Sequence, residues 1–241
     1  DQVAEADYAR ILPKIAADTG KRIAVVGAGP GGLSAAYYLR LKGHAVEVFE
    51  SQAQAGGMLR YGVPSYRLPD PALDKDIEHI RSLGVEIHFN HSVGRDTAFS
   101  DLLENYDAVF VSTGLNVPSQ MRIQGEDHPR VMAGLKLLDD VANGKDPQIG
   151  TSVAVIGGGN VAMDAARVSR RLGARVTVLY RRRIEDMPAD TEEIHEAQAE
   201  GCIFVTQAIP VEALNAEQSG QVTLKWGEAE MLQDPKGGRP R

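Results

Sequence analysis

The sequence predicts an α/β fold with parallel sheets, because one pattern of about thirty residues occurs twice, 130 positions apart. Each copy, at residues 21–50 and 151–180, contains a short apolar run, a glycine turn, an alanine-rich amphipathic stretch, a glycine and a second apolar run. The copies share ten identical residues in one register. This order is typical of a β-α-β unit with a dinucleotide-binding turn after its first strand, so we predict two Rossmann-like dinucleotide-binding domains.

The glycines of each turn meet separate steric requirements. Gly27 lets the chain turn sharply off the strand, Gly29 lets the backbone approach a pyrophosphate, and Gly32 keeps the helix close to the sheet. The second copy has Gly157, Gly159 and Ala162 at these positions. A single pattern of this kind also occurs in ordinary turns. The flanking strands, the helix and the duplication favour a nucleotide at both turns, with its pyrophosphate at the positive end of the helix.

The two copies differ at the position that recognises the ribose. Glu50 ends the second strand of the first copy, where a carboxylate accepts hydrogen bonds from a 2′-hydroxyl and repels a 2′-phosphate. The second copy has Tyr180 there, followed by Arg181, Arg182 and Arg183, whose guanidinium groups suit a phosphate. A basic run is often only a solvated surface, but its placement at the ribose position favours phosphate recognition. We therefore expect FAD at the first turn and NADP(H) at the second.

The remaining elements follow from periodicity and from boundary residues. Residues 1–20 predict a lead-in helix, 21–120 the FAD-binding domain, 121–150 a connector and 151–241 the NADPH-binding domain. Within these ranges we predict a loop at 51–70, helices at 74–83, 101–105, 135–143 and 191–200, and strands at 85–89, 106–111, 203–208 and 222–226. The strand at 106–111 is expected to be buried. Residues 234–241 carry no signal for regular structure.

Composition argues against several other classes of protein. The net charge is −7 and the arginine cluster is local, so no nucleic-acid partner is expected. No apolar stretch approaches the roughly 20 residues of a membrane helix, and the N-terminus lacks a signal-peptide pattern, so we expect no membrane partner and a cytoplasmic location. The single cysteine, Cys202, excludes an internal disulfide, a CxxC pair and an iron–sulfur site made by this chain alone. The six histidines show no metal-binding spacing, so no metal site is expected.

Several motifs resemble one family. GAGPGG, AGGMLRYGVPSYRLP and VFVSTG resemble the FAD half of the small subunit of NADPH-dependent glutamate synthase. IGGGNVAMDAARVSRRLGA and VLYRRRIEDMPADTEEIHEAQAEG resemble its NADPH half. The wider group includes the flavin domain of dihydropyrimidine dehydrogenase, ferredoxin-dependent transhydrogenase subunits and, more distantly, adrenodoxin reductase. The resemblance covers residues 21–215 and implies a glutathione-reductase-like architecture with two nucleotide domains.

The resemblance also implies a function and a set of binding residues. It implies an NADPH:FAD electron-input module whose electrons pass to iron–sulfur centres, an iron–sulfur protein or a large catalytic subunit. No side chain is expected to act as acid or base, because the cofactors supply the chemistry. The residues implied for FAD are Gly27, Gly29, Pro30, Gly31, Gly32, Glu50, Gly57, Leu59, Arg67 and Val93, with Thr113 and Gly114 where the chain leaves the domain. Those implied for NADPH are Gly158, Gly159, Asn160 and Val161, with Arg181 and Arg182 on the 2′-phosphate.

The sequence also departs from the resembled family. That family has a cysteine-rich iron–sulfur domain before the first unit and returns to the FAD domain through a Gly-Asp turn, and neither feature is present in these 241 residues. We therefore interpret the chain as a fragment with two incomplete nucleotide domains, and we expect it to hold FAD loosely or not at all and to show little NADPH oxidation alone. Two alternatives remain open: a ferredoxin- or adrenodoxin-type NADP reductase or transhydrogenase subunit, and a nucleotide-binding domain without turnover.

Overall fold

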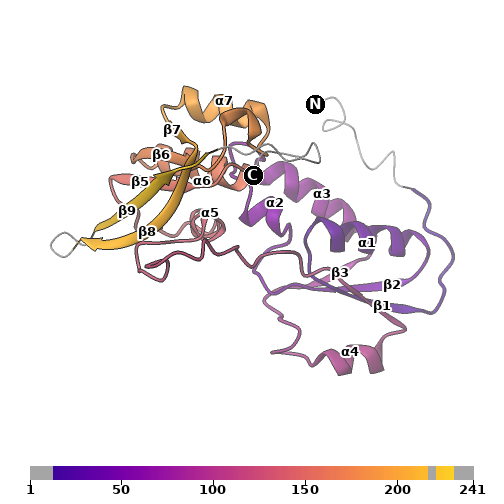
Figure 1. Cartoon of the computed structure of the whole chain (residues 1–241). Coiled ribbons are helices and arrows are strands. Elements are labelled where there is room, and N and C mark those ends of the chain that lie inside the picture. Colours follow the sequence, from indigo (N-terminus) through magenta and orange to yellow (C-terminus); the bar gives the residue numbers. More distant parts are fainter. Residues whose placement is uncertain (1–12, 217–220, 231–241) are drawn as a thin grey trace. The chain divides into compact units, whose positions relative to one another are not determined.

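The computed structural model describes residues 13–216 and 221–230 of the chain (Figure 1). Its contacts divide it into two compact units: unit 1, Asp1–Leu115, and unit 2, Asn116–Arg241. Residues 13–20 of the predicted lead-in helix are not helical, because the amides of Ala16 and Thr19 donate to the carbonyl groups of Leu41 and Gly43 instead. The rest of that predicted helix and the tail at 234–241 lie outside the described residues.

Unit 1 contains a four-stranded parallel sheet with the order β3-β2-β1-β4. Its strands are β1 (Arg22–Val26), β2 (Ala45–Phe49), β3 (Glu86–His88) and β4 (Ala108–Val111). Valine, isoleucine and phenylalanine, which favour strands, supply most of the apolar positions in β1 and β2. In the observed register, Val25 lies between Val48 of β2 and Phe110 of β4. The loops that follow β1, β2 and β4 therefore meet at one edge of the sheet.

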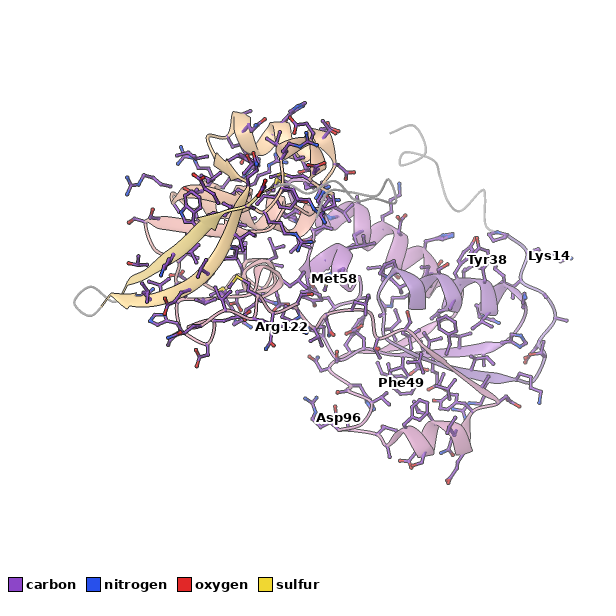
Figure 2. All side chains as sticks on the ribbon, in the orientation of Figure 1. Lys14, Tyr38, Phe49, Met58, Asp96 and Arg122 are labelled. Atoms are coloured by element: carbon purple, nitrogen blue, oxygen red, sulfur yellow. The ribbon has the colours of Figure 1, made fainter. Side chains whose placement is uncertain are left out.

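Helices cover both faces of this sheet. They are α1 (Pro30–Leu41), α3 (Asp70–Ser82) and α4 (Phe99–Asn105). Figure 1 shows α1 and α3 over one face and α4 over the other. Successive residues of β1 point to opposite faces, so Val25 packs with the residues of α1 and α3, whereas Val26 packs with Phe49 and with Leu102 of α4. Figure 2 shows Phe49 on the α4 side.

Three parts of unit 1 differ from the sequence prediction. The predicted loop at 51–70 contains a one-turn helix, α2 (Met58–Tyr61). Helix α3 begins at Asp70 rather than at residue 74, because a proline is well tolerated in the first turn of a helix. The strand at 106–111 is predicted to be buried, but Phe110 and Val111 are 44% and 56% exposed, because β4 pairs with β1 on one side only among the described residues.

Unit 2 also contains a β-α-β unit, formed by β5 (Ser152–Ile156), α6 (Asn160–Arg171) and β6 (Arg175–Tyr180), that corresponds to β1, α1 and β2 of unit 1. Its other elements include α5 (Gly134–Ala142), the 3-10 turn η2 (Ile184–Asp186), α7 (Thr191–Ala199) and β7 (Ile203–Thr206). The strands form a parallel sheet with the order β5-β6-β7. Met163 and Ala166 of α6, Val178 of β6 and Ile194 of α7 share one buried cluster. Helices α6 and α7 therefore both pack on the apolar residues of β6.

The sequence predicts only part of the hairpin that follows. β8 (Ala208–Ala216) and β9 (Gln221–Glu228) form an antiparallel pair, whereas only a strand at 222–226 is predicted. The predicted strand at 203–208 crosses a break at Gln207, whose φ is +54°. Pro210 argues against a strand in the sequence, because proline lacks the backbone N–H that a sheet requires. The strand β8 accommodates Pro210 because its register with β9 shifts between Pro210 and Glu212. The parallel α/β fold is thus confirmed, with an antiparallel ribbon added to it.

The duplication extends beyond the two β-α-β units. Arg40, near the end of α1, donates from Nε to the carbonyl oxygen of Leu83 at 2.8 Å, where α3 ends. Arg170, at the matching position of α6, donates from Nε to the carbonyl oxygen of Glu200 at 2.8 Å, where α7 ends. A guanidinium satisfies carbonyl groups that have no partner within their own helix. The identical arginines therefore anchor the end of α3 to α1 and the end of α7 to α6.

Candidate functional site

The glycine turn of unit 1 joins β1 to α1. Its predicted binding residues are Gly27, Gly29, Pro30, Gly31 and Gly32. Gly27 has φ +101°, and a Cβ there would overlap the carbonyl oxygen of Ser112, which follows β4. Gly29 is the N-cap of α1, and a Cβ at Gly32 would overlap the carbonyl oxygen of Gly27. The structure brings these residues together at the amino end of α1, where unpaired helical N–H groups favour an anion.

Glu50 connects the end of β2 to this turn. Its side chain is buried, and its Oε2 accepts a hydrogen bond from the amide of Ala28 at 2.7 Å. Its Oε1 accepts from the amide of Gln52 at 2.8 Å and from the hydroxyl of Ser51 at 3.2 Å. Since each carboxylate oxygen has two lone pairs, Oε2 retains capacity for one more donor, such as a hydroxyl group. The buried acceptor opposes a second anion such as a phosphate.

The loop after β2 returns to the glycine turn. The amide of Gly56 donates to the carbonyl oxygen of Ala28 at 2.9 Å. Gly57, the N-cap of α2, has φ +52°, and a Cβ there would lie 2.7 Å from the Cα of Gly29. The two glycine segments are therefore in contact, and the amino ends of α1 and α2 meet beside Glu50. The sequence indicates that Gly57 approaches a ligand, but it does not reveal this contact.

Arg60 holds this loop in place, and the sequence prediction does not include it. Its side chain is 6% exposed, and its Nε donates to the carbonyl oxygen of Ala55 at 2.7 Å. Its guanidinium also forms ion pairs with Asp70 and Asp74 of α3. The signal for this role is a basic residue followed by two acidic residues one helical turn apart. Arg60 therefore joins α2 to α3 and to the loop segment next to the contact between Gly29 and Gly57.

The other residues predicted for the first site lie in different surroundings. Leu59 packs against the buried cluster of α1 and α3. Arg67 is half-buried in the segment after α2. Val93 lies in a loop that begins with a hydrogen bond from the amide of His91 to the carbonyl oxygen of Glu50 at 2.8 Å, so it shares the sheet edge with Glu50. Thr113 and Gly114 are exposed and directly follow Ser112, whose amide donates to the carbonyl oxygen of Val26.

The glycine turn of unit 2 has the same form with different side-chain contacts. Gly159 is the N-cap of α6, which begins with Asn160. The side-chain Nδ2 of Asn160 donates to Asp190 Oδ2 at 3.0 Å, and the amide of Asp190 donates to Asn160 Oδ1 at 2.9 Å. This reciprocal pair joins the first turn of α6 to the N-cap of α7. Val161 is 42% exposed and lies beside Gly134 at the start of α5.

The arginines after β6 are not equivalent. Arg183 Nε donates to Asp186 Oδ2 at 3.1 Å, and this hydrogen bond lowers the pKa of Asp186. Arg181 is exposed, whereas Arg182 has a buried Nε without a hydrogen-bond partner among residues 13–216 and 221–230. Neither Arg181 nor Arg182 forms an ion pair in that part of the chain. Of the three arginines, the two predicted for a 2′-phosphate are thus the two that form no ion pair with a carboxylate of the described residues.

In both units, the loop after the second strand of the β-α-β unit forms a hydrogen bond to the carbonyl oxygen at the same position of the glycine turn. In unit 1 the amide of Gly56 binds the carbonyl oxygen of Ala28, and in unit 2 the amide of Ala189 binds that of Gly158 at 3.0 Å. Positions 28 and 158 correspond in the repeat, although the second loop is three residues longer. A helix begins directly after each docking point, at α2 and at α7. Each candidate site is therefore bounded by two helix amino ends and one returning loop.

Other groups that could indicate different chemistry are already engaged. Glu47 and His88 lie near Glu86 in unit 1, but Arg22 binds Glu47 at 2.8 Å. Burial alone would raise the pKa of Glu47, but hydrogen bonds from Arg22, Tyr106 and His88 lower it, while burial and Glu47 raise the pKa of Tyr106 to about 12. Burial likewise raises the pKa of the Cys202 thiol. Over residues 13–216 and 221–230, no helix combines the length and apolar character needed to cross a bilayer.

Comparisons with known sequences agree with this geometry. The family model described as pyridine nucleotide-disulphide oxidoreductase matches residues 21–232. NADP(+)-dependent formate dehydrogenase subunit beta of Moorella thermoacetica is 46% identical over 88% of this chain and 31% of its own length. Glutamate synthase [NADPH] small chain of Escherichia coli is 35% identical over 92% of this chain and 50% of its own length. The resemblance to the glutamate synthase small subunit is therefore confirmed, and the chain spans about a third to a half of these curated relatives.

Solved structures confirm the two-domain fold. FprA of Mycobacterium tuberculosis, in complex with NADPH, has a TM-score of 0.78 at 20% identity, covering 92% of this chain and 66% of its own. Thioredoxin reductase of Lactococcus lactis has a TM-score of 0.62 at 21% identity, covering 87% of this chain and 75% of its own. The family match covers the glycine turns of both units and both returning loops. The chain belongs to the pyridine nucleotide-disulphide oxidoreductase family.

Proposed function

We propose that the chain is the electron-input part of a larger NADPH-dependent oxidoreductase, with FAD in unit 1 and NADPH in unit 2. The observation that carries this proposal is the contrast between the two ribose positions. Unit 1 has a buried carboxylate, Glu50, beside its glycine turn. Unit 2 has Tyr180 at the same position, followed by Arg181 and Arg182. One turn thus suits a dinucleotide with a free 2′-hydroxyl, and the other suits one with a 2′-phosphate.

The residues of unit 1 fit FAD. The backbone contact between Gly29 and Gly57 leaves no side chain between the amino ends of α1 and α2, where a pyrophosphate binds. Glu50 would accept a hydrogen bond from the ribose through Oε2, and the backbone of Val93 lies at the same sheet edge for the adenine. Thr113 and Gly114 follow β4 on that edge. The side chain of Leu59 supports α2 from the core side.

The residues of unit 2 fit NADPH. Gly158 and Gly159 precede α6, whose first turn is fixed by the pair of Asn160 and Asp190. Arg181 and Arg182 form no ion pair among the described residues, and a 2′-phosphate would supply a counter-charge for them.

The chain's own residues bind and orient the reactants rather than exchange protons. FAD, when bound, accepts a hydride from a reduced nicotinamide and delivers the electrons to an acceptor. The two glycine turns hold the nucleotides by their pyrophosphates, which leaves the reactive rings to be placed by the rest of each site. Cys202 is the only cysteine in the chain and is buried, so the chain itself contains no dithiol for disulphide exchange. Iron–sulfur centres or a partner subunit would then receive the electrons.

The choice of partner rests on the relatives. Two similar proteins are a formate dehydrogenase subunit beta and a glutamate synthase small chain, and both names describe parts of multi-subunit enzymes. A large catalytic subunit, as in glutamate synthase, and an iron–sulfur protein are both compatible acceptors. These alternatives are separated by the acceptor that the reduced protein passes electrons to, because NADPH oxidation alone is common to them.

The test compares three variants of the protein. Flavin content is read from the visible spectrum, and flavin reduction is followed after NADPH or NADH is added without oxygen. Glu50→Ala is expected to lose flavin while NADPH affinity is retained. Replacing Arg181 and Arg182 by alanine is expected to weaken NADPH binding about tenfold or more without affecting NADH. Arg175→Ala is the matched control, because Arg175 is an exposed arginine at the opposite end of β6 from Arg181 and Arg182. Equal reduction of the flavin by NADPH and NADH in the unmodified protein would refute the coenzyme assignment.

A further inference from the structure

The two glycine turns differ at one position that faces the ribose-recognising residue. In unit 1 this position is Ala28, whose amide donates to Glu50 Oε2 at 2.7 Å. In unit 2 it is Gly158, and a Cβ there would lie 2.7 Å from both Cδ2 and Cε2 of Tyr180 and 3.0 Å from Cγ of Met187. Alanine thus occurs in the turn that faces the acid, and glycine in the turn that faces the aromatic ring.

Tyr180 is buried, and its two ends have separate contacts. Its ring lies against Gly158, and its hydroxyl donates to the carbonyl oxygen of Asp186 at 3.0 Å. The carboxylate of Asp186 in turn engages Arg183. Three residues later, the amide of Ala189 binds the carbonyl oxygen of Gly158. The loop with the arginines is therefore attached to the glycine turn at its far end and to Tyr180 at its centre.

We infer that Gly158 and Tyr180 form a coupled pair that sets the nucleotide preference of unit 2. Tyr180 is a positioning residue: it holds the loop so that Asp186 engages Arg183 and the charges of Arg181 and Arg182 stay available for a 2′-phosphate. The ring also occupies the position from which a carboxylate would accept a 2′-hydroxyl. The inference rests on the proposed function, since it concerns how that nucleotide site chooses its ligand.

The coupling has a specific steric consequence. An alanine at position 158 would place its Cβ against the ring of Tyr180, and that ring has no free space because it is buried and fixed at its hydroxyl. With glutamate at position 180, the same alanine resembles the arrangement of Ala28 and Glu50, and the remaining close neighbour is the flexible side chain of Met187, whose Cγ would lie 3.0 Å from the added Cβ. The two substitutions are therefore expected to compensate for each other rather than to add.

The experiment is a double-mutant cycle on the full chain with Gly158→Ala, Tyr180→Glu and the two together. Thermal unfolding reports the steric coupling, and titration calorimetry with NADP⁺ and with NAD⁺ reports the preference. Gly158→Ala is expected to lower the melting temperature with tyrosine at position 180 and to lower it much less with glutamate there. The ratio of NADP⁺ to NAD⁺ affinity is expected to fall by at least about tenfold in the double variant, which corresponds to one lost phosphate contact.

Tyr180→Phe keeps the ring and removes only the hydroxyl, so it tests the positioning role if Tyr180→Glu does not fold. It is expected to retain the steric conflict with Gly158→Ala and to weaken NADP⁺ binding without weakening NAD⁺ binding. Equal destabilisation by Gly158→Ala in all backgrounds would overturn the coupling, and an unchanged affinity ratio in the double variant would overturn its role in preference. If the unmodified chain binds both nucleotides equally, the proposed function fails at this site, while the melting temperatures still decide the steric coupling.

Discussion

Replacing Arg167 by alanine is expected to be among the most destabilising single changes in unit 2. Arg167 lies in α6 with 6% of its side chain exposed. Its guanidinium binds Glu193 at 2.6 Å, Glu200 at 2.8 Å and Glu196 at 3.3 Å, all on α7 or at its end. One buried cation thus holds three carboxylates of the neighbouring helix, and its removal leaves Glu193, which is 12% exposed, without this counter-charge.

The chain provides a matched comparison on the same helix. Arg171 also binds Glu200 at 2.8 Å, but 47% of its side chain is exposed. Breaking a buried ion pair by removing one partner costs about 3–5 kcal/mol, because the other charge remains desolvated. An exposed pair contributes about 0–1 kcal/mol. We therefore expect Arg167→Ala to lower the free energy of unfolding by several times more than Arg171→Ala does.

Urea unfolding followed by tryptophan fluorescence measures this difference. Trp226, the single tryptophan, lies in β9 of unit 2. With a urea dependence of about 1–3 kcal/mol per molar, a loss of about 3–5 kcal/mol in Arg167→Ala should shift the midpoint by about 1–5 M. Replacing Arg167 by methionine together with Glu193→Leu should recover part of the loss, because both charges are then removed from the buried site. Similar losses for Arg167→Ala and Arg171→Ala, or no recovery in the double variant, would refute this reasoning.

Three further outcomes follow from the structure. Gly32→Ala should destabilise unit 1 by about 1–3 kcal/mol and lower flavin content, because its Cβ would overlap the carbonyl oxygen of Gly27; a variant with normal stability would contradict this. Arg40→Ala and Arg170→Ala should cause similar losses, measured as faster hydrogen exchange at the ends of α3 and α7 respectively. Burial alone would raise the pKa of Glu200, but hydrogen bonds from Arg171 and Arg167 lower it from its unfolded value near 4.5. The contribution of Glu200 to the free energy of unfolding is therefore present above that value and is lost as pH falls through the folded pKa. Between about pH 6 and pH 3, the melting temperature should fall less in Glu200→Gln than in the unmodified chain.

The parallel cores could be predicted from the sequence because their patterns are local. Apolar runs, glycine turns and alanine-rich helices recur with fixed spacing in residues 21–50 and 151–180, and the observed strands and helices fall within those ranges. The lead-in helix is wrong over residues 13–20, since helical spacing cannot reveal that those amides bind the end of α1. The hairpin of β8 and β9 is predicted only in part, because Pro210 argues against a strand until a register shift makes room for it.

The candidate site could be predicted at its glycine turns but not at its supports. The sequence predicts that Glu50 accepts a hydrogen bond from a ribose, whereas its hydrogen bond from the amide of Ala28 depends on the distance between two loops. Arg60 and Asp190 lie within the motifs that carry the family resemblance, but the sequence does not predict their roles, because their partners become neighbours only when α2 meets α3 and α7 meets α6. Such contacts join residues far apart in the sequence, and a local pattern contains no information about them.

The comparison of the two units explains how one scaffold accepts two nucleotides. Both units share three features: the backbone of the turn, the hydrogen bond of the returning loop to the carbonyl oxygen of Ala28 or Gly158, and an arginine that binds the end of α3 or α7. The differences are confined to the side chains that fill the space between the turn and the end of the second strand. The carboxylate of Glu50 accepts a hydrogen bond from the turn itself, whereas the hydroxyl of Tyr180 donates to the returning loop. We therefore expect nucleotide preference to depend on how that space is filled, together with the charges of the returning loop, and the double-mutant cycle at positions 158 and 180 tests this expectation.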